Sequence, residues 1–236
     1  MNSYRKTAIT VGILFIIATA INMLGKIAFI DPILNAPDYL GKLFANEKQV
    51  ILGGLLIFFS AIACASIAIW LYPILKKHHE ALALGSVVFR VMESMLYIIG
   101  VVGLLSLLTL SHEYAKAGAS NASLFQVSGI ALLAIKDWAG ELSVVAFTVG
   151  AMMYYYVFYQ SKLVPRWLSG WGFLAAVSSL AAVLLSISGQ IAPFSTVFIL
   201  LQIPIGLQEY TLAIWLIVKG FNPSAVAALS AKKATN

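Results

Sequence analysis

Charged residues are scarce in this sequence. They make up 10% of its 236 residues, whereas a soluble globular domain carries about 25%. Hydrophobic residues reach 61%, and the mean hydropathy is +0.94. This composition excludes an ordinary soluble domain and places the chain among integral membrane proteins.

Cysteine is almost absent, because Cys64 is the only one, and an internal disulfide is therefore excluded. Basic runs interleaved with aromatic residues, which are typical of nucleic-acid surfaces, are also missing. We therefore expect no nucleic-acid partner. The pair His78 and His79 beside Glu80 has no further ligands nearby and is interpreted as a solvated loop. We predict no metal site and no cofactor.

Long apolar runs are what the sequence does contain. A helix that crosses a bilayer needs about 20 apolar residues. The sequence therefore predicts an all-α polytopic membrane protein, with a single domain of six transmembrane helices over residues 1–220 and a short polar tail over residues 221–236. The expected spans are residues 6–30, 50–71, 81–110, 142–159, 167–187 and 195–218.

Prolines suggest where the first two helices end. A proline inside a helix removes a backbone hydrogen bond, so Pro32 and Pro73 are expected to stop the first and second spans. Residues 18–20 resemble a signal-peptidase site, but the apolar run continues to Ile30, which favours an uncleaved first span. The aromatic run at residues 152–159 is interpreted as a belt at the inner interface.

Two segments leave alternatives open. Residues 39–44 are either a short interfacial helix, since their apolar side chains have helical spacing, or an ordered loop. Residues 114–121 are expected to be a loop. Beyond them, the charged stretch from Lys136 to Glu141 lies either within one long fourth helix or at a break between a short outer helix and the fourth span.

The distribution of lysine and arginine predicts the orientation, because cytoplasmic loops carry an excess of both. Placing both termini in the cytoplasm puts Lys26, Lys42, Lys48, Lys116 and Lys136 outside. We expect a multi-pass protein of the cell inner (plasma) membrane with membrane lipid as its partner. With both termini in the cytoplasm, the inner side holds more cations than the outer side: Arg5, Lys6, Lys76, Lys77, Lys162, Arg166, Lys219, Lys232 and Lys233.

Arg90 and Glu93 interrupt the third span, where a charge costs at least a few kcal/mol unless it is paired or hydrated. At about 1.5 Å per residue, Arg90 lies roughly 12 Å and Glu209 roughly 15 Å from the inner boundary, so an interhelical ion pair between them is geometrically allowed. We predict a buried polar cluster that contains Arg90, Glu93, Glu141, Glu209, Asp137, Tyr97 and Gln208.

Glu93, Glu141 and Glu209 share one deep cation, and Asp137 adds a fourth acid nearer the outer surface. If all four face one interior, at least one carboxyl group lacks a cation partner and could hold a proton. Such a cluster is typical of a proton relay or of a cavity for a polar or cationic solute. In the alternative, Arg90, Glu93 and Glu209 only lock three helices together, and Asp137 and Glu141 lie in outer water. Pro204 is expected either to kink the sixth helix or to bend it for packing.

Four motifs resemble those of a family of small bacterial membrane proteins, the domain of unknown function 4386. They are LYPILKKHHEALALG at residues 71–85, FRxxE at residues 89–93, SKLVPRWL at residues 161–168, and Glu209 with AIWLIVKGF at residues 213–221. The resemblance covers nearly the whole chain. It implies a polytopic protein of the bacterial inner membrane and implies no reaction.

Three functions remain open. The acid-rich interior favours small-solute or proton-coupled transport, or binding of a small-molecule ligand. An intramembrane enzyme that acts on a lipid is the second hypothesis, although an HExxH motif and a serine–histidine constellation are both missing. The third is a non-catalytic accessory or structural membrane protein. A homo-oligomer is compatible with each of them.

Overall fold

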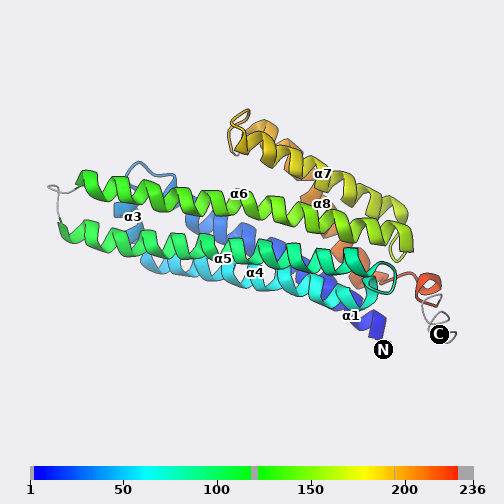
Figure 1. Ribbon diagram of the computed structural model, residues 1–236. Coiled ribbons are helices and arrows are strands. Elements are labelled where there is room, and N and C mark those ends of the chain that lie inside the picture. The colour runs from blue at the N-terminus through cyan, green and yellow to red at the C-terminus, as the bar shows by residue number, and fades with distance from the viewer. Residues whose placement is uncertain (1–2, 118–121, 194, 228–236) are drawn as a thin grey trace. The chain divides into compact units, whose positions relative to one another are not determined.

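The computed structural model describes residues 3–117, 122–193 and 195–227, and in these residues the fold consists of helices without strands (Figure 1). This confirms the all-α prediction. Within the described residues, six helices are long and apolar enough to cross a membrane, so the protein is an integral membrane protein of the multi-pass kind. They are Ser3–Leu34, Glu47–Leu75, Glu80–Ala117, Ser123–Ser161, Arg166–Ile187 and Thr196–Val218.

The first span is built from three consecutive segments: α1 Ser3–Met23, the π-helix η1 Leu24–Ile30, and α2 Asp31–Leu34. The prediction that Pro32 stops this helix is wrong. Pro32 lies in the first turn of α2, where its missing N–H would have no intrahelical partner in any case. The N–H of Asp31 donates to the carbonyl of Lys26, five residues back, so the π-turn leads directly into the new α-helix.

A short helix, α3 Tyr39–Ala45, follows, so the helical alternative for this segment is correct. Asp38 caps it, because its side chain accepts a hydrogen bond from the N–H of Gly41 at 3.2 Å. Leu40 and Leu43 are buried while Lys42 is exposed, which makes α3 amphipathic.

The second span, α4 Glu47–Leu75, contains Pro73, so the prediction that Pro73 ends the helix is also wrong. Pro73 lies in the last turn, exposed, and removes only the hydrogen bond that would reach back to Ile69. The turn is completed beyond it, since the N–H of Lys76 donates to the carbonyl of Tyr72 at 2.9 Å.

The third and fourth spans are the long helices α5 Glu80–Ala117 and α6 Ala122–Ser161 (Figure 1). Helix α6 runs without a break through Lys136 and Glu141, which settles that alternative in favour of one long helix. The loop expected over residues 114–121 begins later than predicted, because residues 114–117 belong to α5, and residues 118–121 lie outside the described residues.

The last two spans, α7 Arg166–Ile187 and α8 Thr196–Val218, match their predicted ranges to within one residue. Ser195 caps α8 by accepting from the N–H of Phe198 at 3.3 Å. Helix α8 contains Pro204 and continues past it. Of the predicted polar tail, residues 228–236 lie outside the described residues.

The chain forms two compact units. Unit 1 comprises Met1–Ile17, Ala63–Glu93 and Val144–Asn236, and unit 2 comprises Ala18–Ile62 and Ser94–Ser143. The apolar core of unit 2 is formed by η1, α2, α3, α4 and α5, with Leu43 and Leu107 fully buried. Unit 1 contains all of α7 and α8, together with Arg90, Glu93 and Glu209.

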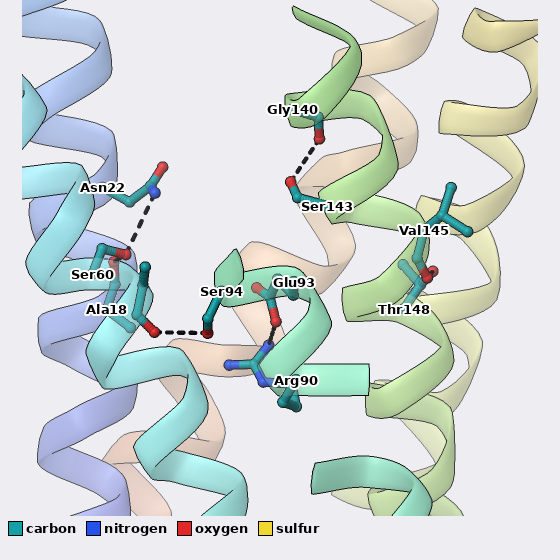
Figure 2. A network of polar contacts seen from close by, with 11 residues as sticks. Ala18, Asn22, Ser60, Arg90, Glu93, Ser94, Gly140, Ser143, Val145 and Thr148 are labelled. Atoms are coloured by element: carbon teal, nitrogen blue, oxygen red, sulfur yellow. Dashed lines mark hydrogen bonds and ion pairs between the residues drawn. The ribbon is translucent and has the colours of Figure 1, made fainter. Parts of the chain in front are cut away.

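Side-chain hydrogen bonds to backbone carbonyls hold α1, η1, α4 and α5 together within unit 2. Ser60 donates to Ala18 O at 2.8 Å, and Ser94 donates to Ala61 O at 2.7 Å (Figure 2). Gln49 donates to Phe29 O, in the π-helix, at 3.0 Å. These bonds satisfy polar groups that face other helices instead of water, as a membrane interior requires.

Candidate functional site

The centre of the site is an ion pair on α5, inside unit 1. The Nη1 atom of Arg90 lies 2.9 Å from Oε2 of Glu93, and their side chains are 2% and 3% exposed (Figure 2). Residues three apart on a helix share a face, so the pair forms within a single helix. Arg90 lies ten residues after Glu80, where α5 begins, or about 15 Å along the helix.

Helix α6 provides the space and an aromatic face for Arg90. The guanidinium carbon lies 5.1 Å from the centre of the Phe147 ring, which is a cation–π contact. One turn further along, a Cβ added at Gly150 would lie 3.4 Å from Cγ of Arg90 and 3.1 Å from Cβ of Phe89. A glycine at this position therefore lets α6 approach the arginine closely.

Helices α4 and α8 complete the surroundings of the pair. The buried thiol of Cys64, on α4, is hydrogen-bonded to the Glu93 carboxyl group. Glu209, half-buried on α8, interacts electrostatically with both Arg90 and Glu93. The site thus brings two carboxyl groups and one guanidinium together in unit 1.

Two fully buried tyrosines of α6 lie beside this cluster. Tyr154 interacts electrostatically with Arg90, and its ring packs edge-on against Phe15 of α1 with the centroids 6.4 Å apart. The hydroxyl of Tyr155 donates to Oε1 of Gln208, whose amide nitrogen donates to Leu168 O at 3.1 Å. The hydrogen bonds of Gln208 therefore fix α6, α7 and α8 against one another.

The remaining residues of the predicted cluster belong to unit 2. Asp137 is exposed and pairs with Lys136 at 2.9 Å, Glu141 is half-buried, and Tyr97 is half-buried on α5. Their convergence on Arg90 stays a prediction.

Sequence reasoning missed a second, half-buried cation inside an apolar span. Lys26, on the π-helix, interacts electrostatically with Asp31, Lys136, Asp137 and Glu141, all in unit 2. The charge distribution predicts this lysine only as one of the cations on the outer side. The signal was its place inside the apolar run of the first span, four residues after Asn22.

The tyrosines of the predicted aromatic belt, residues 152–159, do not all lie at the surface. Tyr156 and Tyr159 are exposed, as an interfacial belt requires, but Tyr154 and Tyr155 are buried in unit 1. Helical geometry gives the reason, because adjacent residues are about 100° apart around the axis and cannot all face lipid. Cys64 and Phe147 carried no signal in the sequence that would distinguish them from other core residues.

Comparisons with known proteins give one match. A family model described as a domain of unknown function (DUF4386) matches residues 10–220. No curated protein matches the chain, and no solved structure does. The matched range includes Arg90, Glu93 and Glu209, so the site lies within the domain that defines the family.

Proposed function

Because the chain belongs to the DUF4386 family, whose description assigns no activity, we propose a function from the site itself: the protein is a transporter that couples the movement of a small polar solute to that of protons. The observation that carries this proposal is the Arg90–Glu93 ion pair, almost fully buried in a helix that can span the membrane.

Stability alone is a poor reason for such a pair. A charged side chain at the centre of a membrane helix costs about 2.5–3.5 kcal/mol on insertion scales. Replacing a buried ion pair with apolar residues of similar volume is often neutral or stabilising. An ion pair of this kind, with Cys64 and Phe147 packed around it, supports a role in binding or moving charge.

The balance of charge in the cluster suggests which charge moves. When Arg90, Glu93 and Glu209 are all ionised, the three groups carry one excess negative charge. A proton on either carboxyl group, or a cationic solute held beside them, makes the cluster neutral. Since net charge is costly in a low-dielectric interior, the cluster is suited to exchange a proton for a small polar or cationic solute.

Proton flux into proteoliposomes tests this proposal. The purified full-length protein is reconstituted around a trapped pH-sensitive dye, and flux is followed under an imposed pH gradient, alone and with a panel of small amines outside. We expect flux above that of empty vesicles for the wild type. Glu93→Gln and Glu209→Gln should each lose most of it, because an amide cannot take up a proton.

Glu113→Gln is the matched control. Glu113 also lies on α5 and pairs with a cation three residues away, Lys116, at 2.9 Å, but both side chains are largely exposed. This variant should retain wild-type flux. The proposal is wrong if the wild type moves neither protons nor any amine, or if the two buried-site variants keep the activity of the control. We further propose the bacterial inner membrane as the location, where a proton gradient can drive such transport.

A further inference from the structure

Four segments of unit 1 meet at one surface, which we call the basic end. The guanidinium of Arg5 donates to Ile217 O at 2.6 Å and to Leu216 O at 3.3 Å, which joins the start of α1 to the end of α8. Lys77 donates to the Tyr4 hydroxyl at 2.8 Å and brings in the α4–α5 loop. The N–H of Asn222 donates to Leu163 O at 2.8 Å and brings in the α6–α7 loop.

The basic end is strongly positive. Glu80 is the one acidic residue in the four segments, residues 3–8, 75–81, 161–167 and 218–222, and six of the seven cations there are exposed, Arg5 being half-buried. The resulting positive field falls off over roughly 10 Å at moderate salt. The cations are Arg5, Lys6, Lys76, Lys77, Lys162, Arg166 and Lys219.

Exposed aromatic side chains flank these cations on the same helices. Trp70, Tyr159 and Trp167 are 48%, 41% and 58% exposed. Trp167 adjoins Arg166, whose guanidinium lies 5.2 Å from the centre of the Tyr159 ring. Tryptophan and tyrosine in this arrangement occupy the headgroup level of a bilayer. The cations next to them therefore lie at the depth of the lipid phosphates.

We propose that the basic end binds the phosphate groups of anionic phospholipids. The argument uses the surface alone and does not depend on the transport activity. Each lysine or arginine close to an anionic leaflet contributes about 1 kcal/mol of attraction, or roughly a fivefold preference. The partner is a lipid leaflet, because the cations are spread over four segments around the ends of six helices, α1, α4, α5, α6, α7 and α8.

Tryptophan quenching by brominated lipid measures this preference. The full-length protein is placed in phosphatidylcholine vesicles that contain increasing brominated phosphatidylglycerol, and quenching gives the relative binding constant of the two lipids. We expect the wild type to prefer the anionic lipid, and high salt to weaken that preference. The triple variant Lys6→Gln, Lys76→Gln and Lys219→Gln should lower it by clearly more than the roughly fivefold expected for one cation. Quenching by brominated phosphatidylcholine stays unchanged if the variant is folded.

The matched control removes the same charge from unit 2. Lys42, Lys48 and Lys116 are exposed, but Asp38, Glu47 and Glu113 lie within four residues of them in the sequence. Lys42→Gln, Lys48→Gln and Lys116→Gln together should leave the preference intact. Equal affinity for both lipids in the wild type, or an equal loss in both triple variants, would overturn the proposal. So would abolition of the preference by inorganic phosphate when sodium chloride of the same ionic strength leaves it in place. The last result would mean a site for soluble phosphate.

Discussion

Substitutions at Arg90 and Glu93 test whether this ion pair serves transport or only stability. Arg90→Met should lower the free energy of unfolding by about 3–5 kcal/mol, since it leaves the Glu93 carboxyl group buried without its cation. Adding Glu93→Leu should recover most of that loss, because the apolar pair can pack in the same space. Unfolding by a denaturing detergent measures the stability of the single and the double variant. The double variant should be stable and yet show no proton flux.

Lys116→Met provides the comparison for this prediction, because the exposed Glu113–Lys116 pair has the same spacing on the same helix. An exposed pair of this kind contributes about 0.2–1 kcal/mol. The prediction is wrong if Arg90→Met lowers the stability no more than Lys116→Met does. It is also wrong if the double variant is as unstable as Arg90→Met alone.

The site was predictable from the sequence only where a polar residue interrupts an apolar run. Arg90 and Glu93 stand out for that reason, and helical spacing alone places them together. The partners of Gln208 were not predictable, since Tyr155 lies in a run that also carries belt residues. The packing of α6 against α8 decides which side chains of α6 face α8, and this packing cannot be deduced from the sequence.

At the scale of elements, prolines were the poorest guide. Both Pro32 and Pro73 lie inside continuous spans, one in the first turn of a new helix and one in a last turn. At Pro32 the missing N–H would have no intrahelical partner in any case, and Pro73 removes one hydrogen bond near the end of α4 without ending the helix. The π-helix before Pro32 could not be predicted either, because its seven residues are as apolar as their neighbours except for Lys26. Helices α7 and α8 were nevertheless predicted closely, although α8 contains Pro204.

Close packing of α4 against the first span depends on Gly53 in unit 2. A Cβ at Gly53 would lie 2.8 Å from Cγ1 of Ile30 and 3.1 Å from Gly25 O. Gly53→Ala should therefore destabilise the protein by about 1–3 kcal/mol through overpacking. At the next residue, a Cβ at Gly54 would meet Leu104 at 3.7 Å, an ordinary contact. Gly54→Ala should be neutral or slightly stabilising, since alanine is the better helix former.

Thermal unfolding in detergent distinguishes the two alanine variants. A lower transition temperature for Gly53→Ala, with that of Gly54→Ala unchanged or higher, is the expected outcome. Equal shifts would show that α4 and η1 can separate slightly without cost, and that the close approach of their backbones is not required for stability.

For the whole molecule, the class of protein was the most predictable property, because 10% charge and six long apolar runs exclude nearly every soluble fold. The division into two compact units was not predictable, since α1, α4, α5 and α6 each contribute residues to both. The orientation of the helices across the membrane is predicted from the lysines and arginines of the loops, and the fold alone does not determine it.

Cysteine labelling determines that orientation. The single natural cysteine, Cys64, is buried, so a membrane-impermeant maleimide should leave the wild-type chain unlabelled in intact cells. Lys42→Cys, between the first two spans, should react from outside, whereas Lys76→Cys should react only after the membrane is opened. The positive-inside rule requires this result, because the basic end carries the larger excess of cations. The reverse pattern would place both termini outside and the basic end on the wrong leaflet for anionic lipid.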